Sequence, residues 1–488
     1  MAHSAWEHSV HCTTGADHMT TSEFRMYGRQ VVDWIADYYN HIEERSVHAR
    51  VRPNEIRDGL PEEIPQQGVS FESLMADIDC LVLPGITHWQ HPRFFGYFPA
   101  NASFPSILGE LLSAGLGVQG MSWITSPVAT DLERLMLDWL AQLLDLPQSF
   151  RSDEPGGGVI QDSASSAVLV ALVAGLNRAS GGTASRHGVG NSNYTVYASK
   201  EAHSSVEKAV QIAGVGGQNL RLVPTSSGTL AMRSDLLEAA IRSDIAAGMA
   251  PALVVGTVGT TSTTAVDPIR EIGQICKETG VWLHVDAAYA GVAACCPEFR
   301  WLNEGVDLAD SYCTNPHKWF LTNFDCDAFW VADRRDMINA LSVMPEYLKN
   351  MATESGEVTD YRDWQIPLGR RFRALKLWFT LSWYGAQGLQ AHIRHHVALA
   401  QEFASWVGSD NRFEVVSAHP LSLVCFRACG DDAVNERLYR RLNETGRIFV
   451  SHTIVDGRFV IRMAIGGTLT ERRHVREAWE LIKDCFGK

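Results

Sequence analysis

The chain has 488 residues, of which 45% are apolar and 20% are charged, a balance typical of a folded protein with a sizeable core. At roughly 150 residues per domain, this length predicts about three domains, or one large domain with smaller additions. The net charge of −14 argues against a nucleic-acid partner, because such binding depends on Lys and Arg that neutralise phosphates. No apolar run approaches the roughly 20 residues needed to span a bilayer, so we expect no membrane partner.

The first residues, MAHSAWEHSVHC, lack the basic start and the apolar block of a secretion signal, which favours a cytoplasmic protein. The ten cysteines are irregularly spaced and too few for a disulfide framework. Cys295 and Cys296 are adjacent and unsuited to a local bridge. Reduced thiols are therefore expected.

Residues 1–100 are predicted to form a helical and extended arm. Thr20 and Glu23 have the spacing of a capping box, and apolar residues follow at helical intervals. Prolines then interrupt the chain around a short helix expected from Phe71 to Ile78. This pattern favours an arm that embraces the second subunit of a homodimer, although a helical cap on the same chain fits the pattern too.

Residues 101–376 are predicted to form a large α/β domain. An apolar stretch from Ala167 indicates a buried helix, and strands are expected at 252–258, 281–288 and 310–315. Between the first two strands, Asp267 and Pro268 have the types expected at the N-cap and first position of a helix. Near-continuous apolar strands separated by a helix predict a parallel sheet covered on both faces, with the active site beyond the carboxyl ends of the strands.

Residues 377–488 are predicted to form a smaller C-terminal domain. A long helical stretch follows Arg370, and helices then alternate with strands expected at 422–427 and 458–465. The sequence contains no visible internal repeat or low-complexity tract.

Lys318 and Asp286 are the residues with the clearest chemistry. Lys318 stands in NPHKW, and partial loss of hydration among apolar neighbours favours its neutral amine, which can form an imine with a carbonyl. A surface lysine is the alternative. Asp286 ends an apolar strand, where its carboxylate needs a cationic partner, and the protonated pyridine nitrogen of pyridoxal phosphate is such a partner. Its alternative is an aspartate that caps the next turn.

The segment EPGGGVIQDSASSA at 154–167 places a Gly-rich loop and several hydroxyl groups before the apolar helix. A helix N-terminus binds anions through its free N–H groups and its dipole, so Ser165 and the neighbouring amides suit a phosphate. His203 could stack on a flat cofactor or serve as an ordinary loop residue. His317, His395 and His396 have no spacing typical of a metal site, and we predict no metal.

The chain resembles the pyridoxal-phosphate-dependent aromatic L-amino-acid decarboxylases of the group II decarboxylase family. The resemblance rests on eight segments in family order: HPRFFGYFPA, GVIQDSASSA, AHSSVEKA, GTTS, WLHVDAAYAG, NPHKW, NFDCDAFWV and DYRDWQIPLGRRFRALKLW. It implies an α/β fold of the aspartate-aminotransferase type (fold type I), with a mainly parallel seven-stranded sheet in the large domain. It also implies a homodimer that binds pyridoxal 5'-phosphate.

The resemblance further implies four catalytic residues. Lys318 holds the cofactor covalently, Asp286 pairs with its pyridine nitrogen and His203 stacks on its ring. Tyr347, in a loop that closes over the site, returns a proton to the substrate carbon. The other implied cofactor-binding residues are Ala164, Ser165, Thr261 and Asn315. The implied substrate-binding residues are Trp89, Tyr97, Phe98, Pro99, Ala100, Gln119, Met121, His317 and Gly369, of which Gln119 and Met121 reach the site across the dimer interface.

The expected activity is decarboxylation of aromatic L-amino acids to the corresponding amines and CO2. The expected substrates are dopa, 5-hydroxytryptophan and tryptophan, with tyrosine and phenylalanine as further candidates. Retention of Tyr347 and His203 favours simple decarboxylation over aldehyde synthesis, and Gly369 favours bulky catechol and indole substrates. Asp162 departs from the family's usual Gly and adds negative charge near the expected phosphate site. An aromatic aldehyde synthase, a decarboxylase of another amino acid such as histidine, and a catalytically silent protein on the same fold are the alternatives.

Overall fold

The computed structural model describes residues 18–190, 193–343, 345–348, 351–355 and 358–487, without the side chains of Tyr347, Glu354 and Ser355. Its larger sheet has seven strands in the order β2-β8-β7-β6-β5-β3-β4. Only β8 runs antiparallel to its neighbours, so the predicted mainly parallel α/β sheet is confirmed. The strands are β2 (Gly157–Gln161), β3 (Tyr194–Ser199), β4 (Leu220–Val223), β5 (Ala250–Thr257), β6 (Trp282–Asp286), β7 (Ser311–Thr314) and β8 (Asp327–Val331).

Helices cover both faces of this sheet, as expected for strands that are apolar along their whole length. On one face, α6 (Ala164–Ala179) packs in a buried apolar cluster with residues of β3, β5 and β8. On the other face, α5 (Pro127–Leu143) and α10 (Ile269–Thr279) join a larger cluster. The apolar run from Ala167 therefore forms the buried helix that its composition predicts.

The predicted start of α10 is wrong. Its N-cap is Pro268 and its first residue is Ile269, so Asp267 does not cap the helix. Instead, the buried Asp267 carboxylate accepts hydrogen bonds from the backbone N–H groups of Met232 (2.7 Å) and Thr257 (2.8 Å). These partners lie 35 and 10 residues earlier in the chain, and they satisfy the carboxylate more fully than one cap bond does.

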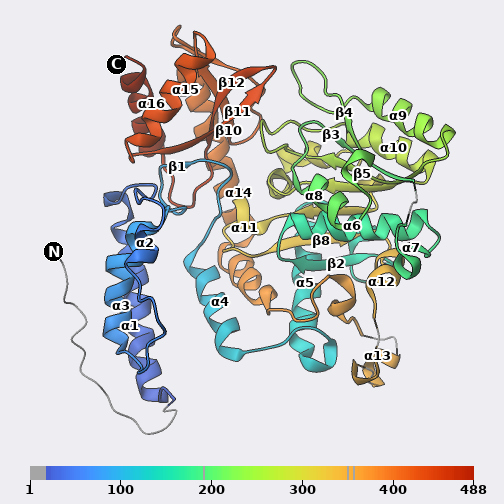
Figure 1. Cartoon of the computed structure of the whole chain (residues 1–488), viewed down its shortest axis with the longest axis horizontal. Helices are drawn as coiled ribbons and strands as arrows, with labels where there is room; N and C mark the ends of the chain where they lie inside the picture. The colour runs from blue at the N-terminus through green and yellow to red at the C-terminus, as the bar shows by residue number, and fades with distance from the viewer. Residues whose placement is uncertain (1–17, 191–192, 344, 349–350, 356–357, 488) are drawn as a thin grey trace.

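A second sheet, in the order β1-β11-β12-β10-β9, lies beside the first and carries helices α15 and α16 (Figure 1). The long α14 (Arg373–Gly408) leads into it, with a break in helical geometry at Gly385, where φ is +59°. The expected domain boundary at 376/377 falls inside α14. The elements are β1 (Phe94–Phe95), β9 (Phe413–Val415), β10 (Leu423–Ala428), β11 (Phe449–Val455), β12 (Arg458–Ala464), α15 (Asp432–Glu444) and α16 (Arg472–Phe486).

The N-terminal segment forms a column of helices along one side of the molecule, with α1 and α3 side by side (Figure 1). The capping box predicted at Thr20 and Glu23 begins α1 (Thr21–Asn40), and the predicted short helix is α3 (Phe71–Asp77). The stacked rings of Tyr27 and Phe71 join the two helices.

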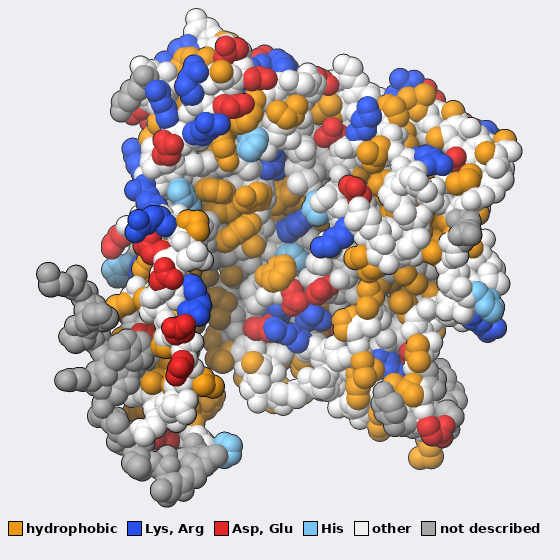
Figure 2. All heavy atoms as spheres, in the orientation of Figure 1, with side chains coloured by type: hydrophobic (Ala, Val, Ile, Leu, Met, Phe, Trp, Pro, Cys, Tyr) orange, Lys and Arg blue, Asp and Glu red, His pale blue; other side chains and the backbone are white. Residues whose placement is uncertain are grey.

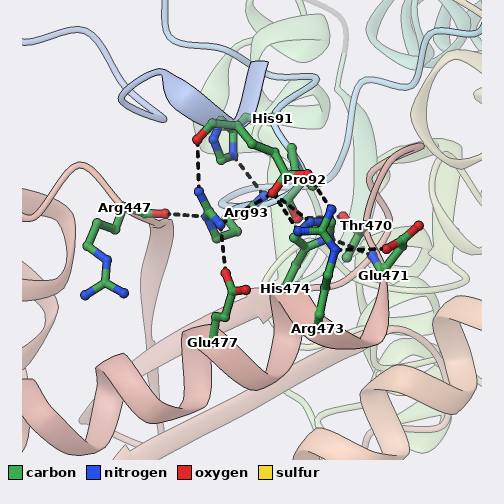
Figure 3. Close-up of polar contacts among 10 residues, drawn as sticks. His91, Pro92, Arg93, Arg447, Thr470, Glu471, Arg473, His474 and Glu477 are labelled. Atoms are coloured by element: carbon green, nitrogen blue, oxygen red, sulfur yellow. Dashed lines mark hydrogen bonds and ion pairs between the residues drawn. The ribbon is translucent and has the colours of Figure 1, made fainter. Parts of the chain in front are cut away.

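Ion pairs attach this column to the C-terminal helix. Arg93 donates to the Glu477 carboxylate of α16 at 2.7 Å and to the Arg447 carbonyl at 3.1 Å (Figure 3). Arg473, also on α16, donates to the carboxylate of Glu43. The first hundred residues are therefore fixed to the last turns of the chain by charge-assisted hydrogen bonds.

The remaining helices are short or peripheral, and no helix in the described ranges is long and apolar enough to cross a membrane. The nine cysteines in this part of the chain are free, and the Cys295 and Cys296 sulfurs lie 3.8 Å apart. The other helices are α2 (Glu55–Asp58), α4 (Phe104–Leu116), α7 (Ala184–His187), α8 (Ser205–Ile212), α9 (Ser234–Ala246), α11 (Pro316–Trp319), α12 (Arg335–Leu341) and α13 (Met351–Ser355).

Candidate active site

A cavity of about 180 Å³ lies beyond the carboxyl ends of β5, β6 and β7, where ligands bind in sheets of this type. All seven residues expected to hold the cofactor line it, together with Phe98 and His317 from the expected substrate set. The lining residues are Phe98, Ser163, Ala164, Ser165, His203, Thr257, Gly259, Thr261, Asp286, Ala288, Tyr289, Asn315, His317 and Lys318.

Asp286 is the last residue of β6, and its side chain is 5% exposed. Its Oδ1 accepts a hydrogen bond from the backbone N–H of Ala288 at 3.0 Å and lies 3.9 Å from the Cys313 sulfur. No Lys, Arg or His nitrogen lies within 4.0 Å of this carboxylate in the part of the chain that the structure describes. A cationic group in the cavity would supply the counter-charge that the buried acid lacks.

Lys318 reaches the cavity from α11, the short helix that follows β7. Burial lowers the pKa of its amine, while Asp286 opposes that shift. The amine lies 5.7 Å from the centre of the Phe98 ring. A lysine whose neutral form is favoured by burial has the reactivity needed to condense with an aldehyde.

His203 lines the cavity from the turn before α8, and its Nδ1 lies 2.9 Å from the Ser205 hydroxyl. Burial lowers the pKa of its imidazole; Asp286 opposes this shift and Lys318 adds to it. The three titratable side chains therefore interact with one another across the cavity, as groups at functional sites often do.

The cavity is lined by the N-terminus of α6 and by residues with unpartnered polar atoms. Its first residue, Ala164, lines the cavity together with Ser163 and Ser165, so the free N–H groups of the helix N-terminus face the cavity. The buried Oδ1 of Asn315 and Oγ1 of Thr257 have no hydrogen-bond partner within the described ranges. Because buried polar atoms are almost always hydrogen-bonded, these orphans fit a phosphorylated cofactor that completes them.

Two stacked aromatic rings, Phe98 and Tyr289, form one wall of the cavity, and a third ring packs behind them. The Phe98 and Tyr289 ring centres are 3.7 Å apart and nearly parallel, and Trp319 stacks on Tyr289 at 4.9 Å. Arg462 of β12 lies over Phe98 and donates to the carbonyl oxygens of Thr261 (2.6 Å) and Tyr97 (3.3 Å). The second sheet thus fixes a loop of the cavity through one buried guanidinium.

The other expected substrate residues lie outside the lining of this cavity. Trp89 and Tyr97 stack on each other with ring centres 5.7 Å apart, and both are partly exposed. Pro99 contacts the backbone at Gly466, and the Ala100 carbonyl accepts a hydrogen bond from Gln90.

Gln119 and Gly369 are brought together elsewhere on this chain. Gln119 accepts a hydrogen bond from the Arg370 N–H at 2.9 Å, and its side-chain amide lies 3.3 Å from the position that a Cβ on Gly369 would occupy. The Met121 carbonyl accepts a hydrogen bond from the Arg362 backbone N–H at 2.9 Å. The side chain of Tyr347 lies outside the described part of the structure.

Sequence reasoning missed several residues of the site. Tyr289, Gly259, Thr257 and Ala288 adjoin the predicted residues along the chain, so inspection of complete strand ends would have found them. Arg462 has no such signal, because it lies within an ordinary strand and reaches the cavity loop only through the tertiary fold.

The scattered histidines serve packing. His396 is buried and accepts a hydrogen bond from the Trp319 indole at 3.0 Å, and His392 packs edge-on against it. The described residues contain no group of three His, Cys, Asp or Glu side chains placed to hold a metal ion.

The fold and the cavity together define the class of protein: an α/β enzyme of fold type I that uses pyridoxal 5'-phosphate. Residues 53–429 match the model of the pyridoxal-dependent decarboxylase conserved domain. The chain belongs to this family of carboxy-lyases.

Curated relatives and solved structures extend this result. The chain is 46% identical over 479 residues to phenylacetaldehyde synthase of Arabidopsis thaliana, with 96% of each chain covered. It is 47% identical over 474 residues to aromatic-L-amino-acid decarboxylase of Sus scrofa, covering 95% of this chain and 96% of the relative. The crystal structure of Oryza sativa TDC with PLP and tryptamine matches with a TM-score of 0.94 and 42% identity, covering 96% of this chain and 99% of that one.

Proposed function

We propose that the protein decarboxylates aromatic L-amino acids to the corresponding amines and CO2. The observation that carries this proposal is the placement of Lys318 and Asp286 in one cavity with the N-terminus of α6. The identity to aromatic-L-amino-acid decarboxylase of Sus scrofa and to tryptophan decarboxylase 2 of Oryza sativa, at 47% and 46%, supports an aromatic substrate.

Pyridoxal phosphate, when bound, supplies a conjugated ring that accepts the electrons left behind as CO2 departs. Lys318 provides the neutral amine that attaches it, and Asp286 provides the negative charge that keeps its ring nitrogen protonated. His203 packs against the ring. At the other end, Ala164 and Ser165 of α6 bind the phosphate, assisted by Asn315 and Thr261.

Two further residues determine the fate of the substrate carbon and the choice of substrate. Tyr347 delivers a proton to that carbon, so the product is an amine. The small Gly369, next to Gln119, leaves room for catechol and indole side chains. A side chain with one methylene and one hydroxyl at position 369 would change the selectivity only moderately. Substrates of choice are therefore dopa, 5-hydroxytryptophan and tryptophan.

The active form in this proposal is a homodimer. Large apolar side chains are exposed along α1, α4 and α5, and Figure 2 places hydrophobic side chains in the hollow between the N-terminal column and the rest of the molecule. Contiguous exposed apolar surface of this kind favours a protein partner. The second subunit contributes Gln119 and Met121 to the pocket. Within each chain, the arm spans residues 1–100, and the large and small domains divide at 376/377. Sedimentation velocity of the holoenzyme tests the dimer.

A cytoplasmic location completes the proposal. Its support is the set of free cysteines in the described ranges, which suits a reducing compartment. Fractionation of cells that express the untagged chain tests this location.

An aromatic aldehyde synthase is the second candidate, because phenylacetaldehyde synthase of Arabidopsis thaliana is as similar as the decarboxylases. It differs in product: molecular oxygen and water are consumed, and aldehyde, ammonia and hydrogen peroxide replace the amine. The deciding experiment incubates purified protein and cofactor with a panel of aromatic L-amino acids and measures CO2, amine, aldehyde and peroxide. Stoichiometric amine and CO2 support the proposal, and aldehyde with peroxide supports the second candidate.

A further inference from the structure

Asp327 is a fully buried acid that the proposed chemistry does not use. It is the first residue of β8 and has 0% exposure. Neither of its carboxyl oxygens has a hydrogen-bond partner in the described ranges, and no Lys, Arg or His nitrogen there lies within 4.0 Å. A buried carboxylate without a partner is strongly unfavourable, whereas a neutral carboxylic acid tolerates such a place.

Asp267 shows what a satisfied buried carboxyl looks like in the same protein. It accepts two backbone hydrogen bonds, and burial raises its pKa to about 6. Asp327 has no such donors. Burial and, next, the charge of Asp286 raise the pKa of Asp327 well above its ordinary value, while Lys318 opposes this shift.

The strand register places Asp327 on the face of the sheet that carries Asp286. Asp286 pairs with Cys313 on β7, and Cys313 pairs with Phe329 on β8. Asp327 precedes Phe329 by two positions, and side chains two positions apart on a strand lie on the same face. Phe329 and Cys313 pack in the apolar cluster of α6, so this is the face that α6 covers.

Asp327 also lies beside the N-terminal end of α6. Its neighbour on β2 is Gln161, and α6 begins three residues further on, at Ala164. The charged and titratable groups that face Asp327 are Asp286 from β6, Cys313 from β7, Lys318 from α11 and Asp162 from the turn before α6. Two of these four, Asp286 and Asp162, are carboxyl groups, so a further negative charge on Asp327 would make the N-terminus of α6 a poor site for an anion.

We propose that Asp327 is a positioning residue of the cofactor site: its carboxyl must carry a proton for the cofactor's phosphate to bind at the N-terminus of α6. This inference rests on the cofactor site proposed above. The proton makes Asp327 neutral and gives it an O–H donor close to the N-terminal end of α6. Loss of the proton adds like-charge repulsion against a phosphate.

Linkage gives the size of the effect. If only the protonated form binds, the dissociation constant rises about tenfold for each pH unit above the pKa of Asp327 in the free protein. A phosphate monoester has its second pKa near 6, so its charge stays constant over the range from about pH 7 upward. The ligand itself therefore contributes no phosphate titration to the measurement.

The test uses the apoenzyme and pyridoxamine 5'-phosphate, which carries the phosphate and ring but cannot form an imine with Lys318. Dissociation constants are measured by quenching of tryptophan fluorescence from about pH 7 upward. The dissociation constant of the wild type should rise with pH. In Asp327→Asn, where residue 327 is neutral at every pH, the rise over the same range should be at least tenfold smaller. The infrared band of a protonated carboxyl should be present in the wild type and absent from Asp327→Asn.

Asp162→Asn is the matched control, because it removes an exposed acid at the same end of the cavity. It should raise affinity and, because the charge of Asp162 helps to raise the pKa of Asp327, move the fall in affinity to lower pH without making that fall shallower. Equal pH dependence in the wild type and Asp327→Asn, or no protonated-carboxyl band in the wild type, overturns the inference. If Asp327→Asn does not fold, the wild type alone is used: its protonated-carboxyl band and its affinity for the ligand must be lost at the same pH. Losses at different pH values also overturn the inference. Failure of the proposed function is distinct: the apoenzyme then binds no pyridoxamine 5'-phosphate at any pH.

Discussion

Lys318 and Asp286 line the same cavity, one from the short helix α11 and the other from the end of β6. The two residues follow or end neighbouring parallel strands, so the sheet itself sets their separation. No direct ion pair within 4.0 Å joins them in the described structure, so neither group neutralises the other by direct contact. Each can therefore act on a different part of one bound molecule.

Substitution of this lysine is the most direct test of the site. Lys318→Ala should reduce amine formation by on the order of 10⁴-fold or more, because no other lysine lines the cavity in the described ranges. The absorbance of the lysine-bound cofactor should vanish as well. Lys277→Ala, on the exposed face of α10, is the matched control and should leave both unchanged. Substantial amine formation by Lys318→Ala would remove the assigned role of Lys318.

Substitution of the expected proton donor should change the product rather than the binding of substrate. Tyr347→Phe lacks the phenolic proton, so aldehyde should replace most of the amine while CO2 release continues. Chromatography of products, with peroxide detection, measures the ratio. Tyr384→Phe, a tyrosine of α14 far along the chain, is the control. An unchanged amine yield in Tyr347→Phe would contradict the assignment.

A buried ion pair between α5 and the segment before α14 should be important for stability. Arg370 donates to both Glu133 oxygens, at 2.6 and 3.1 Å, and also to the Ile160 carbonyl of β2. Arg370→Met leaves the buried Glu133 unpaired and should cost about 3–5 kcal/mol in the free energy of unfolding. The exposed pair of Arg371 with Glu110 offers the comparison, because Arg371→Met should cost under about 1 kcal/mol. Urea titration measures both, and equal costs would refute the difference.

Acid should destabilise the protein through its buried histidines. Burial lowers the pKa of His284 to about 4 and those of His317 and His392 to about 3. The unfolded chain binds protons at these residues below about pH 6.5, whereas the folded chain does not, so stability falls from there towards the folded pKa values. Each neutral histidine contributes about 1.4 kcal/mol per pH unit within that window.

One acid works in the opposite direction. Because burial raises the pKa of Asp267 to about 6, protonation of the folded state adds stability as the pH falls from about 6 towards 3.8. Unfolding midpoints measured from pH 7 to pH 4 should still decrease, and the midpoint of His392→Leu should decrease less steeply than that of the wild type. A slope identical to that of the wild type would exclude His392 as a contributor.

Local patterns predicted three of the seven strands and the two residues at the centre of the candidate site, whereas the seven-stranded sheet was implied only by the family resemblance. Apolar runs identified β5, β6 and β7, and the chemistry of strand ends identified Asp286 and Lys318. Asp267 was misread because its type and position match a helix cap, while its actual hydrogen-bond donors lie on segments that no local pattern connects. Arg462 was missed because the contact between the two sheets exists only in the tertiary structure.

Strand β1 has a consequence for how the protein is made. Phe94 and Phe95 are buried, yet their pairing partners, Phe449 and Val450, are synthesised about 355 residues later. During synthesis these two aromatic side chains stay without their sheet until that later segment has emerged, and exposed apolar surface of this kind is prone to aggregation. Production of this protein in a foreign host should therefore benefit from slower translation or from added chaperones.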